Sequence, residues 1–194
     1  MTSLRVAQII PTTEAEGPGK RFALWVQGCS IRCPGCCNPE MFVADRGGTM
    51  MSPSELVAQI LATPGIEGIS VLGGEPFEQP AGLAEVCAAV RASGLTVMVY
   101  TGYTMAELRE KKSADVDALI STADLLLDGR FDQTKPEKTR RWIGSTNQVL
   151  HFLSDRYRSD EARFTTPNTV EFRFVNGQLT INGWPKAADA FRRK

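Results

Sequence analysis

The chain has 194 residues, with 22 lysines and arginines and 22 aspartates and glutamates, so its formal net charge is zero. This length favours one domain with its own hydrophobic core, and the charge balance argues against a strongly basic nucleic-acid-binding protein. The sequence has no apolar run long enough for a transmembrane helix and no cleavable signal pattern at its start. We therefore expect a cytoplasmic protein that binds neither nucleic acid nor membrane.

Two apolar segments near the start of the chain predict strands. Residues 4–10 (LRVAQII) are rich in β-forming side chains and stop at Pro11, and residues 22–28 (FALWVQG) lead directly into a group of cysteines. A polar loop rich in glycine and proline separates the two strands. Its sequence GPGKR at 17–21 lacks the spacing of a phosphate-binding loop, so we reject that function for it.

After the cysteines, helix and strand patterns alternate along the chain. Ser52 and Glu55 predict a capping box at the start of a helix, and Thr104 and Glu107 predict another. The helices have apolar residues at helical spacing, whereas the strands are continuous apolar runs. The strands are expected within residues 68–75, 95–100 and 124–130, and the helices around residues 52–61, 83–90, 104–107 and 116–120.

The alternating order predicts an α/β fold in which helices cover a parallel sheet. Candidate chemistry follows four strands: the cysteines, GGEP at 73–76, YTGY at 100–103 and LLDGR at 126–130. Because ligands bind at the carboxyl edge of parallel sheets, we expect these four segments to meet at one edge.

The sequence beyond Arg130 becomes polar and then predicts a hairpin. Residues 170–183 (VEFRFVNGQLTING) read as two strands joined by a tight turn at Asn176 and Gly177. A polar tail follows. We therefore assign residues 1–164 to a core domain and residues 165–194 to an extension made of the hairpin and the tail.

Four of the five cysteines fall within residues 28–37, in GCSIRCPGCC. A structural zinc site usually needs a second pair of cysteines, and the only histidine, His151, is far away in the sequence. A thioredoxin-like redox pair would use Cys33 and Cys36 but leave Cys29 unexplained. Three thiolates in one loop suit three corners of a 4Fe–4S cluster, whose fourth iron can then take another ligand.

The spacing C-x3-C-x2-C is the signature of the radical S-adenosylmethionine (SAM) superfamily, and four segments of the chain carry the resemblance. Residues 16–42 resemble the signature region of glycyl-radical-enzyme activating proteins, and residues 73–76 resemble their second SAM-binding element. Residues 125–133 and 144–152 are similar to the activating proteins of anaerobic (class III) ribonucleotide reductase. The resemblance implies a partial, incomplete parallel β/α barrel of radical SAM type, here with a C-terminal β-hairpin extension.

The resemblance also implies roles for individual residues. Cys29, Cys33 and Cys36 are expected to bind the 4Fe–4S cluster. Cys37, which stands where the family often has an aromatic residue, remains an alternative to Cys36. The residues expected to bind SAM are Gly35, Gly73, Gly74, Glu75, Thr101, Asp128 and Asn147. Ordinary turns or helix caps are alternative explanations for most of these, and no residue is assigned a catalytic role. We expect Cys87 to pack in the core.

The family resemblance implies an oxidoreductase that cleaves SAM reductively at the cluster, giving methionine and a 5′-deoxyadenosyl radical. In an activating enzyme this radical removes a hydrogen atom from a backbone glycine of a glycyl radical enzyme, such as anaerobic ribonucleotide reductase. Flavodoxin or ferredoxin is the expected electron donor. The alternative is a small radical SAM tailoring enzyme that acts on a peptide or small molecule. A protein that only transfers electrons is disfavoured, because electron transfer needs no GGEP element.

Overall fold

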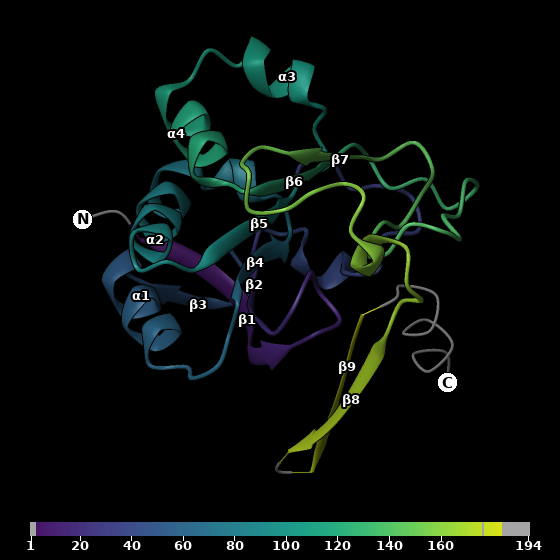
Figure 1. The fold of residues 1–194 in the computed structure, drawn as a ribbon. Helices are drawn as coiled ribbons and strands as arrows, with labels where there is room; N and C mark the ends of the chain where they lie inside the picture. The colour runs from purple at the N-terminus through teal and green to yellow at the C-terminus, as the bar shows by residue number, and fades with distance from the viewer. Residues whose placement is uncertain (1–2, 176, 184–194) are drawn as a thin grey trace.

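The computed structural model describes residues 3–175 and 177–183 (Figure 1). The main sheet consists of β1 (Leu4–Thr13), β2 (Arg21–Val26), β3 (Thr49–Met51), β4 (Gly68–Gly73), β5 (Thr96–Tyr100), β6 (Leu125–Asp128) and β7 (Val149–Phe152). Its strand order is β3-β1-β2-β4-β5-β6-β7. The helices are α1 (Pro53–Leu61), α2 (Pro80–Ala92), α3 (Met105–Glu110) and α4 (Ala114–Thr122). Short 3-10 turns lie at Pro39–Met41, Pro76–Glu78 and Ala162–Phe164.

The centre of the sheet is parallel and its two sides are antiparallel. Strands β2, β4, β5 and β6 pair in parallel, whereas β1, β3 and β7 join the sheet antiparallel. The loop from β1 to β2 is too short for a parallel crossover, which explains the orientation of β1. Strand β1 also continues past Pro11 to Thr13. The pairing of β1 with β2 shifts register between Ile10 and Thr13, and such an irregularity accommodates proline, which has no N–H group to donate. The mixed α/β fold is confirmed, with parallel pairing limited to the four central strands.

Both predicted capping boxes are present. At α1, Ser52 Oγ accepts the Glu55 N–H at 3.2 Å, and the Glu55 carboxylate accepts the Ser52 N–H at 2.7 Å. At α3, Thr104 and Glu107 make the same reciprocal pair. Each box satisfies N–H groups that the first helical turn leaves without partners.

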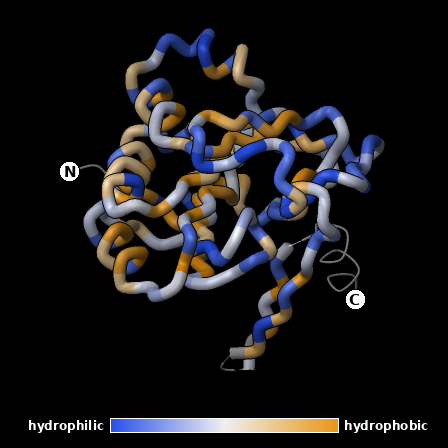
Figure 2. Tube along the Cα trace, in the orientation of Figure 1, coloured by the Kyte–Doolittle hydropathy of each residue, from blue (hydrophilic) through white to orange (hydrophobic). Residues whose placement is uncertain are grey.

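In the part of the chain that the structure describes, the α-helices cover one face of the sheet and leave the other to loops (Figure 1). Strand alternation directs Leu24 and Val26 into the core beneath the helices, where Cys87 of α2 is fully buried as expected. The side chains of Ala23 and Trp25 belong to a second cluster on the opposite face. Long loops cover part of that face, with a third apolar cluster packed under them. Figure 2 shows the apolar residues concentrated in the strands and helices, while these loops are largely hydrophilic. The loop-covered face has room for a binding site.

The predicted hairpin forms a separate two-stranded sheet of β8 (Val170–Val175) and β9 (Gln178–Gly183) that extends from the body (Figure 1). Gly177 of the predicted turn has φ +78°, whereas Asn176 and the tail at 184–194 lie outside the described residues. The hairpin is attached to the end of β1 and the loop after it. The Glu171 carboxylate accepts the Glu14 N–H at 2.7 Å, and Asn182 Nδ2 donates to Thr13 Oγ1 at 2.9 Å.

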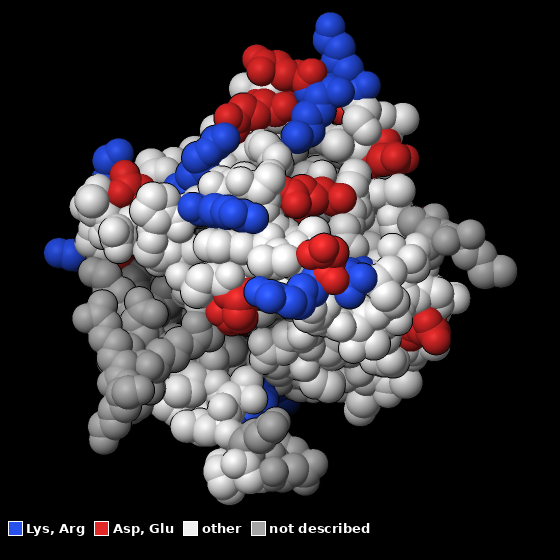
Figure 3. Space-filling model, turned by 180° about the vertical axis from the view of Figure 1, so that it is seen from behind, with Lys and Arg blue, Asp and Glu red and all other residues white. Residues whose placement is uncertain are grey.

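One face of the molecule carries charges of both signs. On the face shown in Figure 3, acidic and basic side chains of the described residues are interspersed. Within residues 3–175 and 177–183, no helix is both long enough and apolar enough to cross a membrane.

Candidate functional site

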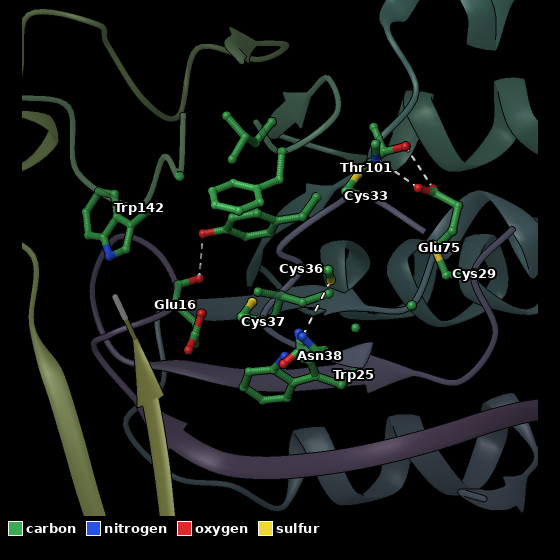
Figure 4. Close-up of a pocket in the computed structure, with 18 of the residues that line it drawn as sticks. Glu16, Trp25, Cys29, Cys33, Cys36, Cys37, Asn38, Glu75, Thr101 and Trp142 are labelled. Atoms are coloured by element: carbon green, nitrogen blue, oxygen red, sulfur yellow. Dashed lines mark hydrogen bonds between the residues drawn. The ribbon is translucent and has the colours of Figure 1, made fainter. Parts of the chain in front are cut away.

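A cavity opens at the carboxyl edge of the parallel strands, on the face that the helices leave uncovered (Figure 4). Each of the four central strands contributes to its lining through the residues that follow it. These are the cysteines after β2, Gly73–Glu75 at the end of β4, Thr101 and Gly102 after β5, and Gly129 after β6. The four segments chosen from the sequence therefore do meet at one edge of the sheet.

The cysteine loop is fixed at its base by main-chain hydrogen bonds. The Gly28 N–H donates to Met41 O at 2.8 Å, and the Cys29 N–H donates to Phe42 O at 3.1 Å. Further along the loop, the Cys36 N–H donates to Cys33 O at 3.1 Å and closes a turn. These contacts hold the ends of the loop while its thiols point toward the cavity.

Backbone N–H groups point at three of the sulfurs. The backbone amides of Ile31 and Arg32 lower the pKa of the Cys29 thiol, and that of Phe131 lowers the pKa of the Cys33 thiol. Cys36 Sγ accepts from Asn38 at 3.5 Å. Burial raises the pKa of the Cys29 and Cys33 thiols, and these N–H groups oppose that effect by stabilising the thiolates.

The thiols fit the chemistry of an iron–sulfur cluster. Cys29, Cys33 and Cys36 are all partly exposed and line the same cavity. Among the described residues, no three cysteine, histidine or carboxylate side chains converge on one point as in a closed metal site. A cluster is held by separate thiolates around its corners, and hydrogen bonds to sulfur tune it. The donor set therefore suits a cluster held by three thiolates, with the cavity beside it.

The glycine turn after β4 lies directly against the base of the cysteine loop. The Gly74 N–H donates to Val26 O at 2.8 Å, and the Glu75 N–H donates to Gly28 O at 2.7 Å. A Cβ atom on Gly74 would lie 2.0 Å from Gly28 O, and one on Gly73 would lie 2.4 Å from the Val26 nitrogen. Only glycine permits this approach of two backbones, so the turn positions the cysteines.

Glu75 links the turn after β4 to the turn after β5. Its carboxylate accepts the Thr101 hydroxyl at 2.8 Å, the Gly102 N–H at 2.9 Å and the Phe77 N–H at 3.0 Å (Figure 4). The side chain is 1% exposed. Burial raises its pKa to about 7, against the lowering effect of these three donors. Glu75 thus holds two cavity-lining turns together at the bottom of the site.

Three of the residues predicted to bind SAM do not line the cavity. Gly35 has φ +74° and faces Gln133, whose side chain a Cβ atom would contact at 2.3 Å. Asn147 Nδ2 donates to Arg130 O at 2.8 Å on a neighbouring surface hollow.

Asp128 is not among the residues that line the cavity, and its carboxylate has other partners. It accepts the Met105 N–H at 2.7 Å, at the start of α3, and lies 2.9 Å from His151 Nε2 of β7. A residue at a strand end can thus serve the next helix instead of a ligand.

The opposite end of the cavity contains Glu16, in the loop between β1 and β2. Its main-chain oxygen accepts the Ser70 hydroxyl at 2.5 Å and the Tyr100 hydroxyl at 3.2 Å. Its Oε1 accepts the Gly183 N–H at 2.7 Å and Asn182 Nδ2 at 3.3 Å. Burial raises the pKa of Glu16 to about 7. The hairpin therefore fixes a carboxyl group at this end of the cavity.

Comparison with known proteins agrees with the chemistry of the site. A family model described as a 4Fe-4S single cluster domain matches residues 15–151. The anaerobic ribonucleoside-triphosphate reductase-activating protein of Salmonella typhimurium is 32% identical over 158 residues, covering 77% of this chain and 99% of the relative. The proteins of the same name from Vibrio cholerae and Escherichia coli are 33% and 31% identical, covering 74% and 75% of this chain and 95% and 97% of those relatives. The chain belongs to the family of anaerobic ribonucleoside-triphosphate reductase-activating proteins.

Several residues that line the cavity were not predicted from the sequence, and most of them lie at the end that contains Glu16. Trp142 and Asn168 line this end from the long loops over the sheet, and Asn182 and Gly183 line it from β9. The last three lie beyond the region that the family model matches. Each of these three is an isolated asparagine or glycine that belongs to no recognisable sequence motif, so only the folded structure shows that they line the site.

Proposed function

We propose that this protein is a radical SAM enzyme that activates anaerobic ribonucleotide reductase by installing a glycyl radical on it. The observation that carries the proposal is the cavity lined by the four cysteines of the loop after β2 and by the glycine turn after β4, in a chain of this family. When bound, a 4Fe–4S cluster supplies the electron that cleaves SAM to methionine and a 5′-deoxyadenosyl radical. The radical then removes a hydrogen atom from a glycine Cα of the reductase.

The chain's own residues have separate tasks in this proposal. Cys29, Cys33 and Cys36 hold the cluster, and their N–H donors stabilise the thiolates. Gly73, Gly74, Glu75 and Thr101 line the space for SAM next to it. Gly35, Asp128 and Asn147 support the surrounding loops in the positions described above. The apolar walls of the cavity exclude water from the reacting atoms.

The open face of the sheet suits a macromolecular substrate. We propose that the sheet is an incomplete β/α barrel, with helices outside and the reacting site on the uncovered face, so that a segment of another protein can enter. The proposed setting is the cytoplasm, with a flavodoxin or ferredoxin as electron donor. A tailoring enzyme for peptides or small molecules is the second candidate.

The test is an electron paramagnetic resonance spectrum of the anaerobically reconstituted protein with SAM, a reductant and the anaerobic reductase of the same organism. A glycyl-radical doublet on the reductase is the expected result. If 5′-deoxyadenosine forms without a doublet, radical chemistry stands and the second candidate replaces the reductase. If the iron-loaded protein does not bind SAM, the radical SAM assignment is wrong.

Glu75→Gln should weaken SAM binding by roughly tenfold or more, because an amide offers one acceptor where three donors now converge on a carboxylate. The measurement is the SAM dissociation constant by anaerobic calorimetry, together with the iron content. Glu110→Gln, which removes an exposed carboxylate on α3, serves as the matched control. Unchanged SAM affinity with intact iron content would remove Glu75 from the proposed SAM site.

Removal of residues 165–194 should spare cluster assembly. We propose that residues 1–164 form the core domain, and all the proposed cluster ligands and the N–H donors to them lie there. The measurement is iron and sulfide per chain after reconstitution, compared with the full-length protein. A truncated chain that does not fold would show that the extension belongs to the core.

A further inference from the structure

Glu16 presents one unused acceptor to the cavity. Its Oε1 is held by Asn182 and Gly183 of β9, and no residue in the described part of the chain donates to its Oε2. Figure 4 shows Glu16 and Trp142 on one side of the cavity, with Glu75, Thr101 and Cys29 on the other. The acceptor therefore faces the end of the cavity that is not occupied by the proposed SAM-binding turn.

Asn168 presents a donor at the same end. Its Oδ1 accepts the main-chain N–H of Trp142 at 2.7 Å. Because an N–H group can only donate, this bond fixes which branch of the amide is oxygen. The other branch, Nδ2, has no acceptor among residues 3–175 and 177–183, and Asn168 lines the cavity.

Trp142, on the same side of the cavity as Glu16, carries two signs of a binding site. Its φ of +63° is a left-handed conformation that non-glycine residues rarely adopt. Its indole Nε1–H is buried and has no acceptor in the described part of the chain. Strain and an unpaired buried donor both cost free energy, and such features concentrate at functional sites.

We propose that Glu16 and Asn168 bind a backbone amide of the polypeptide substrate, with the amide N–H donating to Glu16 Oε2 and its carbonyl accepting from Asn168 Nδ2. This inference rests on the proposed function and names how the glycine-bearing segment is held. Trp25, Trp142 and Ile181 are apolar residues of the lining of the same cavity. The carboxylate disfavours phosphate groups at this end.

The hairpin favours a polypeptide as the occupant. Phe174 pairs with Leu179 on β8–β9, and their side chains are 75% and 57% exposed. Alternation places both on the face that also carries Ile181, which lines the cavity. An apolar face thus leads from the cavity to the surface, as a protein-binding surface does. Asn168 and the hairpin lie outside the matched region 15–151, so the extension contributes part of this end of the site, next to Glu16 and Trp142 of the matched region.

The test compares Glu16→Gln and Asn168→Asp with the wild-type protein. The first replaces the free acceptor by an N–H2 donor, and the second removes the donor but keeps the oxygen that receives the Trp142 N–H. Glu14→Gln, the same change at an exposed residue two positions away, is the control. Three quantities are measured anaerobically: SAM affinity, 5′-deoxyadenosine formation, and glycyl radical as a function of reductase concentration.

We expect each variant to raise the apparent KM for the reductase about tenfold or more while SAM affinity stays within about twofold of wild type. The edge of adenine has the same donor and acceptor pattern as a peptide group, so a loss of SAM affinity in both variants would assign the pair to SAM and overturn the proposal. An unchanged KM in both variants also overturns it. The wild-type protein is measured first. If it produces no glycyl-radical doublet on the reductase, the proposed function fails, and this inference fails with it.

Discussion

Replacing Cys36 with alanine should abolish the iron–sulfur cluster, whereas replacing Cys37 with alanine should leave it in place. Cys36 completes the spacing C-x3-C-x2-C with Cys29 and Cys33. Its N–H donates to Cys33 O and closes a turn, and its sulfur accepts the Asn38 N–H. A cubane bound by two thiolates has lost one of its three protein bonds, so we expect almost no iron to be retained.

The measurement is iron and acid-labile sulfide per chain after anaerobic reconstitution, with the visible absorption spectrum. Both variants remove one thiol from the same loop, so each is the control for the other. Cys87→Ala, which removes a buried thiol in α2, controls for loss of a cysteine elsewhere. A cluster that survives in Cys36→Ala but not in Cys37→Ala would move the third ligand to Cys37.

Gly74→Ala should destabilise the protein by about 3 kcal/mol or more and impair cluster assembly. The added Cβ would lie 2.0 Å from Gly28 O and 2.7 Å from the Gly28 carbonyl carbon, and these are backbone atoms next to Cys29. Relief requires the glycine turn or the base of the cysteine loop to move, which also strains the hydrogen bond between Glu75 N–H and Gly28 O. Loss of stability and loss of bound iron should therefore appear together.

The measurement is thermal unfolding under anaerobic conditions, in which a change of this size lowers the Tm by roughly 6–12 °C for a chain of this length. Gly65→Ala is the control. Gly65 has φ +71° and open space around its Cα, so alanine there adds only backbone strain of about 1 kcal/mol. A Gly74→Ala protein that melts within about 2 °C of wild type would contradict the close approach of the two backbones.

The local features of this fold could be predicted because they depend on neighbouring residues. The two capping boxes need only a hydroxyl and a carboxylate three positions apart, and both form as expected. The continuous apolar runs predicted the central parallel strands, and the N–G turn predicted the hairpin. The antiparallel attachment of β7 was not predicted, because a four-residue strand within a mixed polar segment carries little periodic signal.

In the candidate site, too, some features could be predicted from the sequence and others could not. The cysteine spacing and the glycine turn could be selected from the sequence, because ligand geometry and close backbone approach impose particular residues at fixed spacing. Asp128 shows the limit of such reasoning. It follows a strand as the glycine turn does, yet its carboxylate accepts the N–H of Met105 and it does not line the cavity, so its binding to SAM stays a prediction. Whether a polar residue at a strand end meets a ligand or a helix depends on where the next element packs.

By itself, the sequence determined the thiols, the strands that carry them to one edge of a sheet, and the family to which those motifs point. Only the tertiary structure decided what stands opposite the thiols. Glu16 is fixed by Asn182 and Gly183, more than 160 positions later in the chain, and Trp142 is fixed by Asn168. Spacing and periodicity act over a few residues, whereas the closing of loops and a hairpin over an open sheet face is set by long-range packing and hydrogen bonds. That long-range closure is the physical reason why one end of the site could be read from the sequence and the other end could not.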